Sequence, residues 1–301
     1  MKSTQTLEAG STPDEKGTVA AQEQAQAVAQ DETAERQALA AQRRGAATQL
    51  DFSSRRHTVE QNLEIWNDEY DWSLDGDEWS GQARYCAQPY ERWKQSIIES
   101  FILPYISPTS TVLEVAAGHG RWSREIVDRC GHLIMLDLCP TCIRHCEDLF
   151  AGKNNVSFVV NDGKTLADIG DGGVDFVWSF DSFVHMGASV IDSYLGEMRR
   201  VLKEGGTAVI HHPGRRHHAL PLKFLRNMGT NGRRLYKLVS MGRLRQDDGW
   251  RSDISRETVA RLAQRNGLTV RGQFQRWGPG GQFTLDKYGD CITVMYRQRS
   301  L

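Results

Sequence analysis

The chain has 301 residues, and its 37 lysines and arginines almost balance 38 aspartates and glutamates. A balanced charge excludes a molecule-wide field for binding polyanions. No apolar run reaches the length of a membrane span and no apolar signal core opens the chain, so we expect a soluble cytoplasmic protein.

Residues 1–57 form a polar tail rich in alanine and glutamine. Large apolar residues are few, and the helix-favouring part at 18–49 has no continuous apolar face. Such a segment buries too little surface to offset chain entropy, so we predict disorder with transient helix. A helix that binds a partner is the alternative.

Residues 58–108 form an aromatic-rich segment, with a helical pattern at 91–101. Aromatic rings in such a segment either pack helices onto a sheet or contact a ligand. We predict a helical cap next to the first strand. Its aromatic residues include Trp66, Tyr70, Trp72, Trp79, Tyr85, Tyr90 and Trp93.

Residues 112–120, Val-Leu-Glu-Val-Ala-Ala-Gly-His-Gly, join an apolar run to a turn of small residues, and a helix is predicted at 121–130. A second apolar run, at 132–137, ends in Asp137. A strand, a glycine turn, a helix and a strand with a terminal acid are how an open α/β sheet holds an adenosine-containing cofactor. The glycines let the backbone approach the ligand, and the acid accepts hydrogen bonds from ribose.

The glycine turn does not identify the cofactor by itself. A dinucleotide site usually carries a third glycine, where this chain has Ser123. Glu114 lies inside the first strand, where a carboxylate repels a pyrophosphate and suits a ligand bearing an ammonium and a sulfonium. S-adenosylmethionine is such a ligand. A turn without any ligand is the alternative.

The later elements alternate as a parallel α/β sheet requires. Ile191, Leu195, Met198 and Leu202 recur at helical spacing, and that helix stops at residues 204–206. We predict strands at 156–160, 174–180 and 207–211, a helix at 255–266, and a last strand pair at 268–277 and 290–296.

The Glu-x-Ala-x-Gly-x-Gly pattern of residues 114–120, with this element order over residues 80–297, resembles the class I S-adenosylmethionine-dependent methyltransferases. The resemblance implies an α/β, Rossmann-like fold. Its sheet has seven strands, mostly parallel with an antiparallel last strand, and helices on both faces. It places the methyltransferase domain at residues 109–301, after the tail and the cap segment.

The resemblance also implies the residues of the cofactor site. The turn after the first strand shapes the methionine pocket, Asp137 holds ribose, and Asp162 reads adenine. In the family an N-terminal helical segment closes over the cofactor, and an aromatic face attracts a sulfonium, so Tyr85, Tyr90 and Trp93 are candidate contacts. The predicted cofactor residues are Glu114, Ala116, Gly118, Gly120, Asp137, Leu138, Asn161, Asp162, Gly163, Ser179, Phe180 and Tyr85.

Three histidines are candidates for the base that removes a proton from a hydroxyl acceptor. His185 follows the strand at 174–180 after a short loop, and His211 and His212 end the next strand. Side chains alternate along a strand, so only one of that pair faces the site. Asp181 orients such a histidine or bonds the acceptor. A packing role for His185 is the alternative.

Cysteines and histidines cluster twice without predicting a metal site. Cys139, Cys142 and Cys146 with His145 supply enough ligands for zinc, but Pro140 marks a helix start and the strand order supports no cluster. His217 and His218 suit magnesium poorly, because it prefers oxygen ligands. We therefore predict no metal.

Residues 213–249 form a basic insertion that we interpret as a lid over the acceptor site. Its charge favours an anionic acceptor bearing a phosphate, a uronate or a pyrophosphate. A solvated basic surface is the alternative. Its cationic residues are Arg215, Arg216, Lys223, Arg226, Arg233, Arg234, Lys237, Arg243 and Arg245.

Residues 118–122, 161–164, 178–185 and 209–212 together resemble methyltransferases of bacterial surface polysaccharides and sugars. This implies O-methylation of a sugar or another polar small-molecule or glycan acceptor. The Asn/Asp-Pro-Pro-aromatic motif of amino-directed nucleic-acid methyltransferases is absent at residues 179–183, so we expect no nucleic-acid partner.

Three other functions stay open at this point. They are N- or C-methylation of a small metabolite, a nicotinamide-dinucleotide dehydrogenase, and a catalytically silent subunit that binds a nucleoside. The sequence is also compatible with a homo-oligomer.

Overall fold

The computed structural model describes residues 57–70, 72, 86, 88–214, 229–232, 235 and 251–299. The chain divides into two units, Met1–Asp51 and Phe52–Leu301, and every described residue belongs to the second. The predicted disordered tail, Tyr85, the histidines at 217 and 218, and most of the predicted lid lie outside the described residues.

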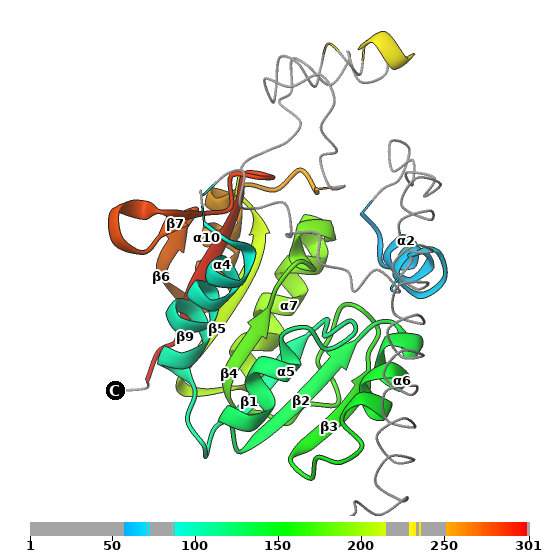
Figure 1. The fold of residues 1–301 in the computed structure, drawn as a ribbon, viewed down its shortest axis with the longest axis vertical. Coiled ribbons are helices and arrows are strands. Elements are labelled where there is room, and N and C mark those ends of the chain that lie inside the picture. Colours follow the sequence, from blue (N-terminus) through cyan, green and yellow to red (C-terminus); the bar gives the residue numbers. More distant parts are fainter. Residues whose placement is uncertain are drawn as a thin grey trace, which may run out of the picture. The chain divides into compact units, whose positions relative to one another are not determined.

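Seven strands form one sheet in the order β3-β2-β1-β4-β5-β9-β6 (Figure 1). The first five strands along the chain pair in parallel, and β9 runs antiparallel between β5 and β6. The predicted sheet, mostly parallel with an antiparallel last strand, is confirmed. The strands are β1 (Thr111–Val115), β2 (His132–Asp137), β3 (Val156–Val160), β4 (Val174–Ser179), β5 (Leu202–Pro213), β6 (Leu268–Phe274) and β9 (Asp290–Arg297), with a separate ribbon of β7 (Arg276–Trp277) and β8 (Phe283–Thr284).

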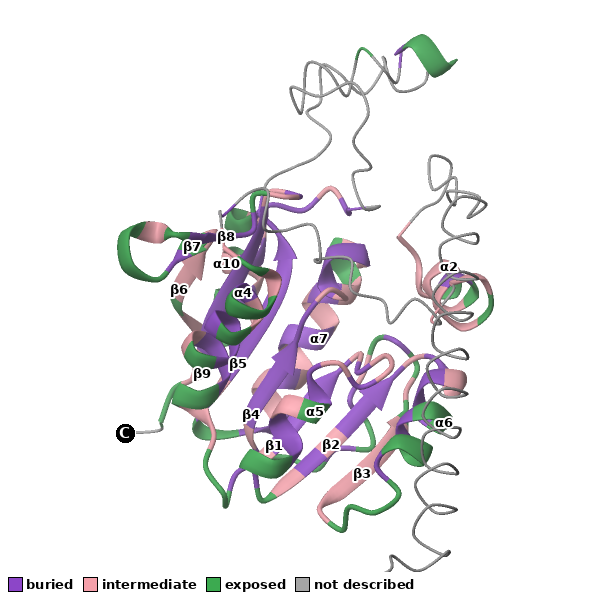
Figure 2. Ribbon diagram, viewed as in Figure 1, coloured by how far each residue is buried: buried purple, intermediate pink, exposed green. Residues whose placement is uncertain are grey.

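Helices cover both faces of the sheet, as predicted, because successive strand residues point to opposite sides. Val112 belongs to the apolar cluster of one face and Leu113 to that of the other. Figure 2 shows the central strands buried, whereas the edge strand β3 is mostly half-buried. On the first face lie α4 (Tyr90–Ile97), α5 (Ser123–Ile126) and α6 (Pro140–Leu149); on the second lie α7 (Ala188–Val201) and α10 (Arg256–Arg265).

Two helix boundaries differ from the predictions. The helix predicted at 121–130 is only the short α5 followed by a 3₁₀ turn, Val127–Arg129. Helix α7 ends at Val201, and β5 begins at once instead of at residue 207. A register shift between β4 and β5 absorbs residues 203–206 as an irregularity of the strand. The glycine pair therefore lies inside the strand as a bulge and does not stop the helix.

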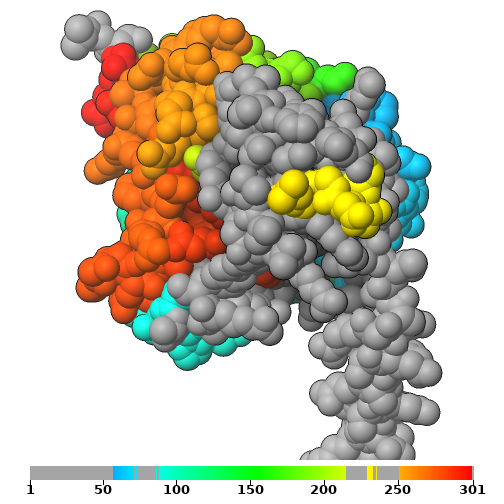
Figure 3. Space-filling view, turned by 90° about the horizontal axis from the view of Figure 1, so that it is seen from above, coloured from blue at the N-terminus to red at the C-terminus, as the bar shows by residue number. Residues whose placement is uncertain are grey.

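The carboxyl ends of β1 and β4 lie side by side, although the chain leaves them toward opposite halves of the sheet. Open α/β sheets bind ligands at such a switch point. Figure 3 views this end from above, with the described residues before 72 and the segment 251–299 on opposite sides. Ala116 follows β1 with φ of 60° and Asp181 follows β4 with φ of 67°. Left-handed backbone outside glycine costs energy and clusters at functional sites.

Trp93 packs helix α4 into the apolar cluster on the first face of the sheet and ties the helix to the β7-β8 ribbon. The ring is fully buried, and its Nε1–H donates to the carbonyl oxygen of Thr284 at 3.1 Å. We expect Trp93→Ala to lower the free energy of unfolding by about 3–5 kcal/mol, because it leaves a large cavity. Denaturant titration followed by circular dichroism measures this. Leu103→Ala, at a side chain 39% exposed, serves as control and should cost less than about 1 kcal/mol. Equal losses in the two variants would contradict the packing.

Candidate functional site

A cavity of about 480 Å³ lies at the switch point. The ends of β1, β2 and β4 line one side, and α2 (Val59–Leu63) with the following π-helical turn, Glu64–Glu69, contributes to the other. Its volume is in the range of small-ligand sites. The predicted residues that line it are Ala116, Gly118, Asp137, Leu138, Gly163, Phe180, Asp181 and His185.

The turn after β1 presents backbone to the cavity. Gly118 and Gly120 have φ of 55° and 76°, a conformation that glycine adopts readily. A Cβ atom on Gly118 would lie 3.0 Å from the ring of Trp72. The ring of Trp72 therefore lies directly against this glycine, and the predicted close approach of the backbone to a ligand stays a prediction. Gly120 does not line the cavity and packs beside Phe150.

Asp137 fixes the geometry of this turn. Its Oδ2 accepts the N–H of Gly118 at 2.8 Å, and its Oδ1 accepts the N–H of Cys139 at 2.8 Å. Burial raises the pKa of the carboxyl group, while these backbone hydrogen bonds oppose the shift. A carboxylate has about four lone-pair sites, so acceptor capacity is left for ribose hydroxyls.

Glu114 lies one layer behind the turn and does not line the cavity. It shares a face of β1 with Val112, toward α5, where the Ser123 hydroxyl donates to its Oε2 at 2.6 Å. Burial raises its pKa to about 8, against an ordinary 4.5, while the Ser123 hydrogen bond opposes this. The carboxyl group is therefore largely protonated near neutral pH. A neutral Glu114 neither repels a pyrophosphate nor attracts a sulfonium, so its charge does not distinguish the two kinds of cofactor.

The residues after β3 and β4 divide between cavity and support. Asp162 is exposed and closes its own turn, accepting the N–H groups of Lys164 and Thr165 at 2.8 and 2.7 Å. Asn161 donates to the hydroxyl of Tyr194 at 2.8 Å, and neither residue lines the cavity. The adenine contact of Asp162 stays a prediction.

Ser179 is likewise buried behind the cavity, and its hydroxyl donates to the carbonyl oxygen of Val115 at 2.7 Å. Phe180, the next residue, does line the cavity.

His211 does not reach the cavity, which corrects its predicted placement beside the reacting atoms. It is fully buried behind Phe180, with the two rings stacked at 4.2 Å. Its Nδ1 accepts the N–H of Asp181 at 3.1 Å, and its Nε2 lies 3.3 Å from Oδ2 of Asp290. An acceptor role at Nδ1 places the ring proton on Nε2, toward Asp290. The geometry makes His211 a support for Asp181.

His212 points to the opposite face, as strand alternation requires. Its Nε2 lies 2.6 Å from the hydroxyl oxygen of Thr293, and burial lowers its pKa to about 4. The His212 ring is therefore neutral near pH 7, and it belongs to the core on the side of the sheet away from the cavity.

Asp181 lines the cavity within a group of charges. Oδ2 lies 3.6 Å from Nη1 of Arg121, and Oδ1 lies 3.5 Å from Nη2 of Arg251. Arg251 is buried and donates to Asp290 at 2.9 Å from Nη2. Although burial by itself raises the pKa of Asp290, Arg251 and His211 hold that pKa well below its usual range.

His185 is the one predicted histidine that borders the cavity. It lies on the 3₁₀ turn Phe183–His185, nearly buried, with its ring 4.9 Å from that of Trp66. Its carbonyl oxygen accepts the side-chain N–H of Asn62 at 3.0 Å, so the turn is tied to α2. This placement is compatible with the predicted catalytic role.

Several cavity residues were not singled out from the sequence. Trp72 stacks on His119 at 4.3 Å, and His119 stacks on His145 at 3.9 Å. Of the predicted aromatic contacts, Tyr90 lines the cavity and Trp93 does not. The aromatic content of the segment was visible, but no pattern in it indicates which rings turn inward. Other aromatic and polar cavity residues that were missed include Asn62, Trp66, Tyr70, Lys94, Arg121, Trp122 and Arg124.

Of the four residues weighed as a zinc site, Cys139 and Cys142 lie close together, beside Asp137, whereas His145 and Cys146 make other contacts. His145 belongs to the ring stack, and the Cys146 thiol donates to the carbonyl oxygen of Gly118 at 3.3 Å.

Within the described part of the chain, no helix is long and apolar enough to cross a membrane.

Comparisons with known proteins find a methyltransferase domain in part of the chain. A family model described as a methyltransferase domain matches residues 112–206. Over 98 residues, the chain is 31% identical to phosphoethanolamine N-methyltransferase 1 of Triticum aestivum. That match covers 32% of this chain and only 20% of the relative. Residues 112–206 of this chain therefore match a methyltransferase domain.

Two solved structures show the fold. A putative sarcosine dimethylglycine methyltransferase from Galdieria sulphuraria is similar, with a TM-score of 0.52 and 16% identity over 80% of this chain and 98% of the other. The YcgJ protein of Bacillus subtilis has a TM-score of 0.50 and 14% identity over 70% of this chain and 100% of the other. These two likenesses show the fold, whereas it is the matched methyltransferase domain that implies S-adenosylmethionine as the cofactor.

The buried Glu114 generates a pH dependence of stability. Its pKa is higher in the folded chain than its ordinary 4.5, so the folded state holds this proton between pH 4.5 and about 8. The contribution of this proton to the free energy of unfolding is full below pH 4.5, and it falls as the pH rises from 4.5 to about 8. Since one pKa unit corresponds to about 1.4 kcal/mol, we expect a loss of a few kcal/mol.

Glu114→Gln should flatten this loss, because the amide does not ionise. Denaturant unfolding of the nucleoside-free protein at pH 5.5 and 8.5 measures the difference. Glu147→Gln, the same change at an exposed position of α6, should keep the wild-type slope. An identical slope in Glu114→Gln would show that this carboxyl group does not titrate as described.

Proposed function

We propose that the protein transfers a methyl group from S-adenosylmethionine to an oxygen of a small polar acceptor, such as a sugar hydroxyl. His185 is the general base in this proposal. One observation carries it: His185 and the nucleoside-type acid Asp137 line the same cavity. The methyl donor and the base can therefore meet without a rearrangement of the sheet.

The chain's own residues hold the donor. Asp137 takes the ribose hydroxyls, and the turn at Ala116–Gly118 gives backbone to the methionine end. Trp66, Tyr70 and Trp72 line the cavity, and aromatic faces attract a sulfonium. When bound, the donor supplies an already activated methyl group. The protein's part is placement of the acceptor and exclusion of water.

Positive side chains support an anionic acceptor. Lys94, Arg121 and Arg124 all line the cavity, so cations exist in the described core as well as in the predicted lid. Arg121 and Lys94 each also pair with an acid, Asp181 and Glu125 respectively. Guanidinium and ammonium groups suit phosphate and carboxylate ligands.

A second candidate is N-methylation of a small phosphorylated amine. The name of the wheat relative indicates such an acceptor for that protein, and the same cations suit its phosphate. An amine presents its own lone pair once neutral, so it depends less on a strong base than a hydroxyl does. The two candidates therefore differ in their need for His185.

Cofactor binding separates the methyltransferase from a dehydrogenase. We expect calorimetry to detect binding of S-adenosylhomocysteine and no binding of NAD. Asp137→Asn should lower the affinity for S-adenosylhomocysteine by roughly 10- to 100-fold, because the ribose hydroxyls lose a charged hydrogen-bond acceptor. Asp148→Asn, at an exposed position on α6, is the control. Saturation with NAD and indifference to S-adenosylhomocysteine would overturn the proposed cofactor.

His185→Asn tests the base. With an oxygen acceptor found by a screen with labelled methyl donor, we expect kcat to fall by roughly 10²- to 10⁴-fold. Binding of S-adenosylhomocysteine should stay within a few-fold. His132→Asn, the same change at the amino end of β2, should leave kcat unchanged.

The screen also separates the candidates. Turnover of a phosphorylated amine with little effect of His185→Asn supports N-methylation instead. If no acceptor is methylated although S-adenosylmethionine binds, the silent-subunit alternative gains support.

A further inference from the structure

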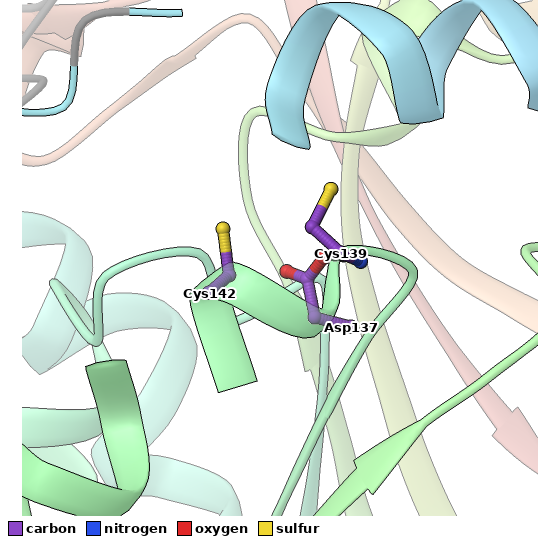
Figure 4. A group of neighbouring side chains, drawn as sticks. All are labelled: Asp137, Cys139 and Cys142. Atoms are coloured by element: carbon purple, nitrogen blue, oxygen red, sulfur yellow. Dashed lines mark hydrogen bonds between the residues drawn. The ribbon is translucent and has the colours of Figure 1, made fainter. Parts of the chain in front are cut away.

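A second chemical grouping lies at the edge of the cavity. One side-chain ligand atom from each of Asp137, Cys139 and Cys142 lies within 4.8 Å of the others. Figure 4 shows the two thiols pointing to the same side at the start of α6, with the carboxylate of Asp137 between them. The partner of these two cysteines is thus the carboxylate of Asp137, and not Cys146 and His145 as their sequence spacing suggests.

The geometry is close to that of a bound soft metal. Zinc–sulfur and zinc–oxygen bonds of about 2.3 and 2.1 Å place the ligand atoms of one ion about 3.5–4 Å apart. Small rotamer changes in the three side chains therefore suffice. The cysteines occupy the N-cap and the first turn of the ten-residue helix α6, so the backbone holds both in place.

Burial and access are both favourable. All three residues are buried, and Asp137 and Cys139 border the cavity, which provides an entry path for an ion. A hydrogen bond with Cys142, burial and the nearby Asp137 raise the pKa of the Cys139 thiol. The Cys139 thiol is therefore protonated without metal, and a bond from its sulfur to a metal ion releases that proton to solvent.

We propose that Asp137, Cys139 and Cys142 form a site for a thiophilic divalent cation, such as Zn²⁺, whose occupancy excludes the nucleoside donor. Metal binding itself is independent of the proposed function, whereas the exclusion rests on Asp137 as the ribose ligand. The metal ion and the ribose of the donor would use the same lone pairs of Asp137, namely those that do not accept the N–H groups of Gly118 and Cys139. A divalent charge there also repels a sulfonium.

In this proposal the bound ion inhibits the protein. Three protein ligands hold the ion at the place that ribose would occupy, and its fourth coordination position is open to the cavity. A structural zinc site, by contrast, has four protein ligands. Cys146, the next thiol on the same helix, is engaged with the carbonyl oxygen of Gly118.

Cobalt is the spectroscopic probe for this site. The full-length reduced protein, first stripped with a chelator, is titrated with Co²⁺, and thiolate-to-cobalt absorption is recorded. We expect one equivalent to bind and Zn²⁺ to displace it. Cys142→Ser should bind at least tenfold more weakly, and Cys291→Ser, an equally buried thiol on β9, should behave as wild type. Circular dichroism establishes that both variants fold.

Calorimetry with S-adenosylhomocysteine then tests the exclusion. With chelator present, we expect the wild type and Cys142→Ser to bind S-adenosylhomocysteine with equal affinity. Saturating Zn²⁺ should lower the affinity for S-adenosylhomocysteine at least tenfold in the wild type only. Failure to bind with chelator present would contradict the proposed function and leave the cobalt result standing. The metal site is overturned by an absent cobalt–thiolate signal, by an equal signal in Cys142→Ser, or by a disulfide between the two cysteines in place of bound metal. Unchanged nucleoside affinity with metal bound would overturn the exclusion.

Discussion

The carboxylate of Asp137 joins the two backbone segments on which the cavity depends. It ends β2, yet its oxygens accept N–H groups from the turn after β1 and from the start of α6. Without this bridge the glycine turn would have buried donors to satisfy in another way. The same carboxylate borders the cavity. One buried group thus sets both the shape of the site and its polarity, so a ligand and a metal that use it compete directly.

A second buried chain of polar groups supports the neighbouring strand end. Arg251 pairs with Asp290, Asp290 lies beside His211, and His211 accepts the backbone N–H of Asp181. Removing one member of a buried charge pair leaves the other uncompensated. The left-handed backbone of Asp181 therefore persists because groups from β5 and β9 determine it. The Asp181 carboxylate, which faces the cavity, is thus positioned by residues that do not line the cavity themselves, and Arg251 also contacts that carboxylate directly.

The sheet was predictable from the sequence because each strand is an apolar run bounded by turn residues, and the glycine turn with Asp137 placed the site. Side-chain direction was not predictable. Glu114 and His211 both lie on strands that end at the cavity, but strand alternation sends Glu114 toward α5 and His211 behind Phe180. A pattern of period two gives two faces without saying which is which. Trp72 was equally hidden, because its inward position depends on a stack with His119 formed across the fold.

The place of His185 follows from the same constraint. Strand residues near the cavity are fixed by the ladder, so a side chain there either faces the ligand or is buried, as His211 is. A short turn after the strand has no such alternation. The left-handed Asp181 redirects the chain, and the 3₁₀ turn that follows brings His185 to the cavity, where Asn62 ties its carbonyl group to α2. A base held between the sheet and the aromatic cap depends on both, so the cap contributes to positioning the proposed base as well as to covering the donor.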